Sequence, residues 1–139
     1  MTAYLGIGTN LGDREVNLHT AVSLINEQAG HVLACSSFIE TAPWGFCSKN
    51  KFLNAVVEIE TIHSPHTLLR ITQNIERQMG RTHKSVNGDY ADRIIDIDIL
   101  LYGDLRVNDD DLIIPHPLMW ERQFVYEPLL EIAPHIKKS

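Results

Sequence analysis

Two aspartates share one side of the strongest predicted strand in the chain. Residues 94–102 read Ile-Ile-Asp-Ile-Asp-Ile-Leu-Leu-Tyr, an alternating pattern typical of a β-strand. In an extended chain Asp96 and Asp98 point to the same side, about 7 Å apart. The opposite side is expected to carry Ile95, Ile97, Ile99 and Leu101. Two carboxylates held in this way could bind a hard cation such as Mg²⁺ and leave positions for water and phosphate oxygens. The alternative is a solvated strand face that tolerates the charge repulsion.

Basic side chains flank this acidic pair in the sequence. Arg81 and Arg93 precede the strand, and His116 and Arg122 follow it. A metal together with arginines can hold and neutralise a polyphosphate during phosphoryl transfer. The alternatives are solvated surface arginines and, for His116 between Pro115 and Pro117, a structural turn histidine.

The usual nucleotide-binding fingerprints do not fit the chain. The Gly6-x-Gly8 segment misplaces the third glycine of the dinucleotide motif, and no G-x-x-x-x-G-K-[ST] sequence occurs. If ATP binds, something other than a Walker loop holds it.

A polar residue also interrupts a second predicted strand. Asn54 lies on the same side of residues 52–61 as Phe52. A buried amide needs hydrogen-bond partners. It could bond a neighbouring loop, or it could read a flat heterocycle on which Phe52, Trp44 or Phe124 stacks.

The elements that must position these side chains follow from periodicity and end signals. Expected strands are residues 3–8, 31–39, 52–61 and 94–102, with a possible short strand at 105–107. One helix is expected to begin at the N-cap Asp13 and end at Gly30, and a second to begin at Ser64-Pro65 and end at Gly80. Short helical segments are expected after Ile113.

The order β-α-β-β-α-β predicts an α+β, ferredoxin-like fold. Such a fold is an antiparallel sheet with helices packed on one face, here followed by a C-terminal extension. The length of 139 residues and the absence of linkers or repeats predict a single domain over residues 1–139. The fold hosts many functions, so it does not decide between them.

Composition narrows the range of partners. Twelve Lys+Arg against eighteen Asp+Glu give a net charge of −6, which argues against a nucleic-acid partner because phosphate neutralisation requires a basic face. A few focused cations could still bind one small phosphorylated ligand. Cys35 and Cys47 are too few for a disulfide framework, and no apolar run reaches membrane-spanning length. We therefore expect a cytoplasmic protein with no membrane partner.

Four segments of the chain together resemble the 6-hydroxymethyl-7,8-dihydropterin pyrophosphokinases of folate biosynthesis. They are Leu-Gly-Ile-Gly-Thr-Asn-Leu-Gly-Asp-Arg at 5–14; Glu-Thr-Ala-Pro-Trp-Gly at 40–45 with Phe-Leu-Asn at 52–54; Arg-Ile-Ile-Asp-Ile-Asp at 93–98; and Ile-Pro-His-Pro at 114–117 with Arg122, Phe124 and Pro128. The resemblance extends from about Tyr4 to Pro134, and the family's ferredoxin-like fold agrees with the predicted order of elements.

The resemblance implies an ATP-dependent enzyme that transfers pyrophosphate to the pterin hydroxymethyl group and releases AMP. It implies two Mg²⁺ ions bound by Asp96 and Asp98, with Arg81 and Arg93 also in catalysis. The implied pterin site is Thr41, Pro43, Trp44, Gly45, Phe52, Asn54 and Phe124. The implied ATP site is Leu69, Gln73, Glu76, Arg81, Arg93, Ile99, His116 and Arg122. The expected partners are these small molecules only, and a monomer is expected.

Two other classes of protein share some of these features. An RNA-binding module can have the same order of elements, but it is expected to carry basic and aromatic side chains on its central strands, where this chain has two aspartates. A regulatory domain could bind a nucleotide or a pterin without turnover. Replacing Asp96 and Asp98 by asparagine separates the enzyme from the regulatory domain, because only an enzyme has a transfer activity to lose.

Overall fold

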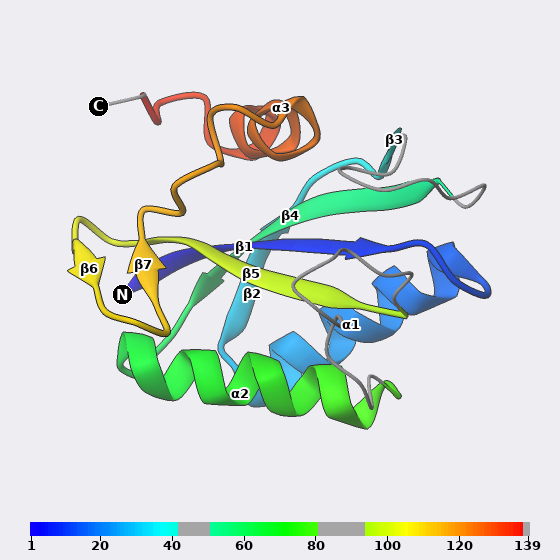
Figure 1. Cartoon of the computed structure of the whole chain (residues 1–139), viewed down its shortest axis with the longest axis horizontal. Helices are drawn as coiled ribbons and strands as arrows, with labels where there is room; N and C mark the ends of the chain where they lie inside the picture. The colour runs from blue at the N-terminus through cyan, green and yellow to red at the C-terminus, as the bar shows by residue number, and fades with distance from the viewer. Residues whose placement is uncertain (42–50, 81–93, 138–139) are drawn as a thin grey trace.

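The computed structural model describes residues 1–41, 51–80 and 94–137. Its elements are β1 (Thr2–Thr9), α1 (Arg14–Gln28), β2 (His31–Cys35), β3 (Ile39–Thr41), β4 (Phe52–Glu60), α2 (Pro65–Gln78), β5 (Asp96–Tyr102), β6 (Val107–Asn108), β7 (Ile113–Ile114) and α3 (Gln123–Ile132). Figure 1 shows the main sheet in the middle, with α1 and α2 on one face and α3 on the other.

The main sheet is antiparallel, in the order β2-β4-β1-β5, and β3 also pairs with β4. Strands β6 and β7 form a separate two-stranded sheet. The predicted α+β fold with an antiparallel sheet is confirmed. The prediction of one strand over 31–39 is wrong, since β2 and β3 are separate strands that both lie against β4.

Local hydrogen bonds at Ser36 explain the break between β2 and β3. The N–H of Ser36 donates to the Val56 carbonyl, and its Oγ accepts from the Val56 N–H, each at 2.9 Å. The hydroxyl thus takes the place of a backbone carbonyl as the acceptor for Val56, and the backbone of β2 ends its pairing with β4 at this point. Glu131 of α3 then accepts hydrogen bonds from the N–H and Oγ of Ser37, at 3.0 and 2.7 Å.

Both predicted helix starts are confirmed. The carboxylate of Asp13 accepts a hydrogen bond from the Val16 N–H, and the Ser64 hydroxyl accepts one from the Thr67 N–H. These side chains satisfy donors that have no partner within the first turn of a helix.

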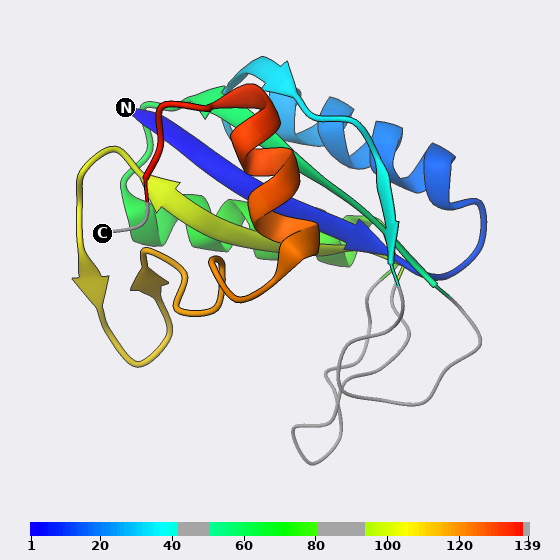
Figure 2. The ribbon, with the colours of Figure 1, turned by 90° about the horizontal axis from the view of Figure 1, so that it is seen from above.

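The two helices of the predicted core lie on one face of the sheet as expected, and the C-terminal extension adds a helix on the other face (Figure 1). The extension forms the ten-residue helix α3, which packs on the face of the sheet opposite α1 and α2 (Figure 2). Pro128 lies inside α3 and supplies no backbone N–H, which weakens the sequence signal for a helix. Pro128 and Leu129 are nevertheless buried, so tertiary packing stabilises the helix.

Each face of the sheet has its own apolar cluster. The face under α1 and α2 is closed by a large core that includes Leu5, Leu18, Ile25, Val57, Ile59, Leu68 and Ile75. The other face has a smaller cluster of Tyr4, Val56, Leu100, Met119, Leu129 and Ala133. The alternation predicted for residues 52–61 is confirmed by the burial of their side chains on these two sides.

A β-bulge changes the alternation predicted for β5. Tyr4 lies opposite Leu101 and Leu5 opposite Ile99, so Leu100 is an extra residue in the ladder. Leu101 consequently packs beside Leu100 against the smaller cluster, and not with Ile95, Ile97 and Ile99 as expected. Among the residues that the structure describes, no helix is long and apolar enough to cross a membrane.

Candidate active site

The predicted site residues meet on the face of the sheet that carries α3. In the register of the sheet, Gly8 of the central strand β1 pairs with Asn54 on one side and Asp96 on the other. Two residues earlier, Gly6 pairs with Val56 and with Asp98. Side chains of directly paired residues point to the same face of a sheet. Two rows therefore cross the three strands, with a bare glycine backbone in the middle of each.

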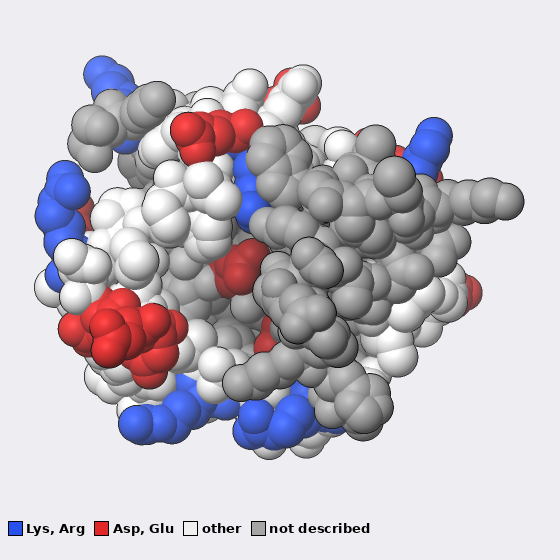
Figure 3. Space-filling model, viewed as in Figure 1, with Lys and Arg blue, Asp and Glu red and all other residues white. Residues whose placement is uncertain are grey.

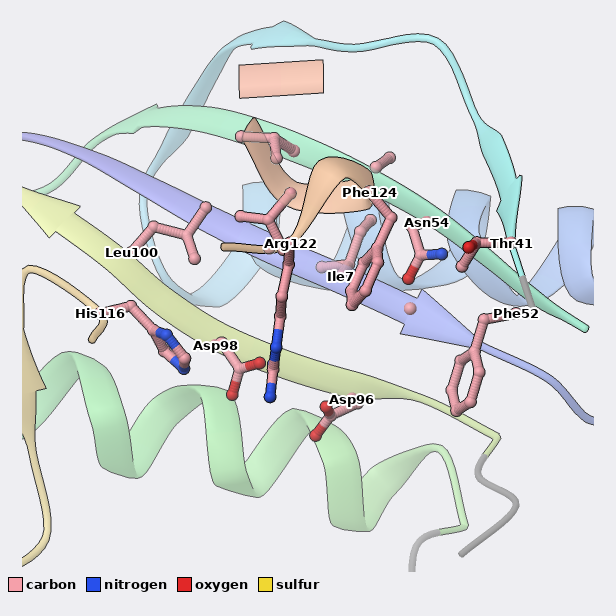
Figure 4. Close-up of a pocket in the computed structure, with 15 residues that line it drawn as sticks. Ile7, Thr41, Phe52, Asn54, Asp96, Asp98, Leu100, His116, Arg122 and Phe124 are labelled. Carbon is pink, nitrogen blue, oxygen red and sulfur yellow. The ribbon is translucent and has the colours of Figure 1, made fainter. Parts of the chain in front are cut away.

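A pocket lies over these two rows. Figure 4 shows its side chains, and Figure 3 shows acidic atoms in a hollow near the middle of the view, with basic atoms above them. It is lined by Gly6, Ile7, Gly8, Thr41, Phe52, Asn54, Ala55, Val56, Asp96, Asp98, Leu100, His116, Arg122, Phe124 and Val125. Sheet strands form its floor, while β3, the loop after β7 and the start of α3 form its walls.

Asp96 and Asp98 point into the pocket from β5, as their spacing predicted (Figure 4). The strand is fixed from behind, because the buried carboxylate of Glu76 on α2 accepts a hydrogen bond from the Ile97 N–H at 2.9 Å. The two carboxylates therefore project from a backbone held between β1 and α2. A pair of oxygen ligands on a rigid strand suits a divalent cation of the Mg²⁺ type.

Arg122 brings positive charge to the carboxylates. It lies at the N-cap position of α3, is 9% exposed, and points toward the two aspartates in Figure 4. Its guanidinium carbon is 5.9 Å from the centre of the Phe124 ring, within range of a cation–π contact. An arginine of this kind can hold phosphate oxygens by charge-assisted hydrogen bonds.

His116 is a neutral imidazole at neutral pH. Burial lowers its pKa below the usual 6.5, as does the charge of Arg122, while Asp96 acts in the opposite direction. Its Nδ1 accepts a hydrogen bond from the Leu118 N–H at 3.2 Å. The neutral ring therefore carries its proton on Nε2, which is a hydrogen-bond donor. His116 thus makes a hydrogen bond within its own turn, as the structural interpretation expected, and its side chain also lines the pocket.

Asn54 bonds the neighbouring strand β3, as one interpretation of its sequence position expected, and it also lines the pocket. Its Nδ2 donates a long hydrogen bond of 3.4 Å to the Ile39 carbonyl of β3, and its Oδ1 lies over Gly8 inside the pocket. The amide is 6% exposed, so it is held by its surroundings. Phe52 and Phe124 lie on either side of it in Figure 4 and can contact a flat ring.

Arg14 at the start of α1 fastens the strand ends beside Thr41. Its guanidinium donates to the Glu40 carboxylate at 2.7 Å and to the Lys51 carbonyl at 2.9 Å. This hydrogen bond, with the charges of Arg14 and Lys51, lowers the pKa of Glu40. The ends of β3 and β4 are thereby joined to one helix.

The other predicted site residues fall into two groups. Four lie on the α2 side and do not line the pocket: Leu69, Gln73, Glu76 and Ile99. The side chain of Ile99 is buried in the core, so only its backbone, on the same strand edge as the Ile97 N–H, can face a ligand. Five residues lie outside the described part of the chain: Pro43, Trp44, Gly45, Arg81 and Arg93.

Sequence reasoning missed the pocket floor. Gly6 and Gly8 were considered for a dinucleotide fingerprint and as part of one segment of the family resemblance, and neither they nor Leu100 and Val125 were assigned to a site. The available signal was two glycines inside a strand, which often mark a place where another group approaches the backbone closely.

A second group of ligating side chains lies away from this pocket. His66 at the start of α2 places Nε2 2.8 Å from Asp109 and 3.6 Å from Asp111, in the acidic patch over the β6–β7 hairpin (Figure 3). Both aspartates are exposed. Among the described residues, no arginine forms an ion pair with these aspartates, and they do not line the pocket described above.

Paired carboxylates, an arginine and a neutral histidine around one pocket are typical of enzymes that transfer a phosphate-containing group with the help of a divalent cation. Comparison with known proteins narrows this class. The family described as 7,8-dihydro-6-hydroxymethylpterin-pyrophosphokinase (HPPK) matches residues 4–134.

Several relatives carry the name 2-amino-4-hydroxy-6-hydroxymethyldihydropteridine pyrophosphokinase. The protein from Porphyromonas gingivalis is 49% identical over 132 residues, covering 94% of this chain and 90% of the relative. The protein from Bacillus subtilis is 42% identical over 138 residues, covering 99% of this chain and 81% of the relative.

The fold is similar to that of a crystal structure of an HPPK-DHPS in complex with substrates, with a TM-score of 0.79 at 17% identity. That match covers 99% of this chain and 41% of the solved chain. The chain belongs to the HPPK family. It is an ATP-using pyrophosphokinase, and its activity is part of folate biosynthesis.

Proposed function

We propose that Asp96 and Asp98 hold two Mg²⁺ ions in this pocket. The donor set fits such ions, because both carboxylates face the pocket on one rigid strand and the wall opposite carries Arg122. Bound Mg²⁺ would neutralise the phosphate charges of ATP and polarise the phosphorus that is attacked. With the cations present, an acidic chain can bind a polyanion.

The pterin is proposed to lie over the glycine floor between Asn54 and the carboxylates. The amide of Asn54 provides a hydrogen-bonding group for the edge of the heterocycle, while Phe52 and Phe124 contact its faces. Thr41 lies at the end of β3 and supplies a further polar group. Pro43, Trp44 and Gly45 are assigned to the same site from the family resemblance alone.

ATP is proposed to bind along the edge of β5 and reach the pocket with its phosphates. Arg122 and the Nε2–H of His116 would donate hydrogen bonds to phosphate oxygens. The backbone of Ile99 and the α2 side chains supply the nucleotide side. The proposed contacts are Leu69, Gln73, Glu76, Ile99, His116 and Arg122, together with Arg81 and Arg93 from the resemblance.

The role of these residues is to bind and orient two substrates. The pterin hydroxymethyl oxygen forms a bond to the β-phosphorus of ATP, the bond from that phosphorus to the α,β-bridging oxygen breaks, and AMP leaves while the hydroxyl proton is released. No covalent enzyme intermediate is required, because alignment and charge neutralisation account for the catalysis. Arg81 and Arg93 are proposed to assist Asp96 and Asp98 in this step.

We further propose that residues 1–139 act as one domain and as a monomer in the cytoplasm. One pocket contains every proposed pterin contact among the described residues, so the site does not need a second copy of the chain.

The juxtaposition of Asn54 with Asp96 across Gly8 is the observation that carries the proposal. We expect purified protein incubated with 6-hydroxymethyl-7,8-dihydropterin, ATP and Mg²⁺ to produce AMP in equal amount to the pterin diphosphate. Chromatography of the nucleotides measures this directly. Formation of ADP in place of AMP would contradict pyrophosphoryl transfer. Omission of Mg²⁺ should abolish formation of AMP and of the pterin diphosphate.

A further inference from the structure

We propose that Gly8 is a positioning residue for pterin recognition, because its lack of a side chain allows the Asn54 amide oxygen to lie over strand β1. The inference rests on the proposed function and assigns part of its substrate specificity to a residue without functional groups. The substrate feature concerned is an N–H group on the edge of a flat heterocycle.

Asn54 lies so close to Gly8 that a β-carbon at position 8 would collide with its amide oxygen. A Cβ built at Gly8 would lie 2.7 Å from Oδ1 of Asn54. Real Cβ atoms essentially never come within 3.0 Å of such an atom. Its other near neighbours are the Phe52 ring at 3.7 Å and Cγ of the same asparagine at 3.8 Å. All three nearest atoms thus belong to side chains that line the pocket.

Asn54 has little freedom to avoid such a β-carbon. Its Nδ2 donates to the Ile39 carbonyl on the opposite side, and Ile39 is its direct partner in β3. The side chain is buried, at 6% exposure. A methyl group at position 8 would therefore turn the amide away from its hydrogen bond and change the direction in which the oxygen faces the pocket.

Gly6 provides a matched control on the same strand. It also lines the pocket, on the same face as Gly8. A Cβ at Gly6 would meet only the Leu100 side chain, at 3.5 to 3.7 Å, which is ordinary van der Waals contact. Neither glycine has a positive φ that would exclude alanine. The two positions differ in whether alanine displaces Asn54.

The test compares Gly8→Ala, Gly6→Ala, Asn54→Ala and the double variant Gly8→Ala/Asn54→Ala in the full chain. Steady-state kinetics with varied pterin and varied ATP, pterin titrations and thermal unfolding are measured for each. We expect Gly8→Ala to raise the KM and Kd for pterin by about ten-fold or more, which corresponds to the loss of one hydrogen bond to a buried polar group. The KM for ATP should change by less than about three-fold, and Gly6→Ala should raise the pterin constants by a smaller factor than Gly8→Ala, because its β-carbon would not meet Asn54.

The double variant shows whether Gly8 acts through Asn54. In the Asn54→Ala background, alanine at position 8 should raise the KM and Kd for pterin by less than about two-fold, because the colliding side chain is gone. If Gly8→Ala does not fold, removal of Asn54 should restore folding.

Equal effects of Gly6→Ala and Gly8→Ala on pterin binding would overturn the inference. So would an undiminished effect of Gly8→Ala in the Asn54→Ala background, or a double variant that also fails to fold. A wild-type chain that transfers nothing to the pterin would instead overturn the proposed function, so the two failures are distinguishable.

Discussion

The two faces of the main sheet are built from the same strands but differ in how they are covered. One face lies under α1 and α2, and its side chains form a closed apolar core. The opposite face is covered by α3 and the residues around Met119 along only part of its length. The remaining part of that face is the pocket, where β1 contributes glycines and β5 contributes Asp96 and Asp98.

The difference shows how an alternating strand separates stability from function. Odd-numbered residues of β1, such as Leu5 and Ile7, enter the core, while Tyr4, Gly6 and Gly8 face the other side. Along that second side, Tyr4 belongs to the smaller apolar cluster and the glycines to the pocket floor. A substitution in an apolar cluster should therefore affect unfolding, and one in the pocket should affect catalysis.

The largest effect is expected on the pocket face. Replacing Asp96 and Asp98 by asparagine should lower kcat by at least about a hundred-fold, since a bound cation contributes several kcal/mol of charge stabilisation. The pterin should still bind. AMP production and pterin titration measure the two properties separately.

Asp104→Asn is the control for this double substitution. Asp104 is exposed in the turn after β5, so the same chemical change there should leave kcat unaltered. Equal rates for the Asp96/Asp98 double variant and for wild type would show that the carboxylate pair has no catalytic role. Loss of pterin binding along with activity would show that the pair also orders the floor of the pocket.

The core face should respond in stability and not in turnover. Leu18 of α1 is fully buried, so Leu18→Ala should lower the free energy of unfolding by about 2–5 kcal/mol. Leu33 on β2 is 51% exposed, and Leu33→Ala should change it by no more than about 0.5 kcal/mol. Urea unfolding measures both. A loss of turnover by folded Leu18→Ala protein would mean that the faces are coupled.

The smallest effect is expected where the helix of the core face anchors a wall of the pocket. Arg14 donates a hydrogen bond to Glu40, which lowers the pKa of that carboxyl below 4.5. The contribution of this pair to stability is present above the ordinary pKa and is lost as the pH falls through the lowered one. Because both groups are partly exposed, Glu40→Gln should lower Tm by at most about 2 °C near neutral pH.

Thermal unfolding at several pH values checks the sign. The Tm difference between wild type and Glu40→Gln should disappear as the pH falls through the lowered pKa of Glu40, where the carboxyl becomes protonated. Glu27→Gln, a change at an exposed position near the end of α1, is the control. A difference that persists unchanged in acid would assign it to something other than the ion pair.

Much of this arrangement was predictable because it depends on local periodicity. The strand alternation at residues 52–61 and at 95–98, and the caps at Asp13 and Ser64, were read correctly from the sequence. Local rules were insufficient where distant segments decide the outcome. The division of residues 31–39 depends on a Ser36 hydroxyl that bonds Val56, and the side of Leu101 depends on a bulge against β1.

The site divides in the same way. Asp96 and Asp98 had to share a side because side chains alternate along any extended chain, and Asn54 had to share a side with Phe52 for the same reason. Which strands are neighbours was not contained in that periodicity. Only the pairing of β4, β1 and β5 places Asn54, Gly8 and Asp96 in one row, and only α3 on the open face brings Arg122 and Phe124 over it. The sequence by itself determined the chemistry of each side chain and its direction along its own strand. The tertiary structure decided which of these side chains face one pocket, because contacts between strands join residues far apart in the chain.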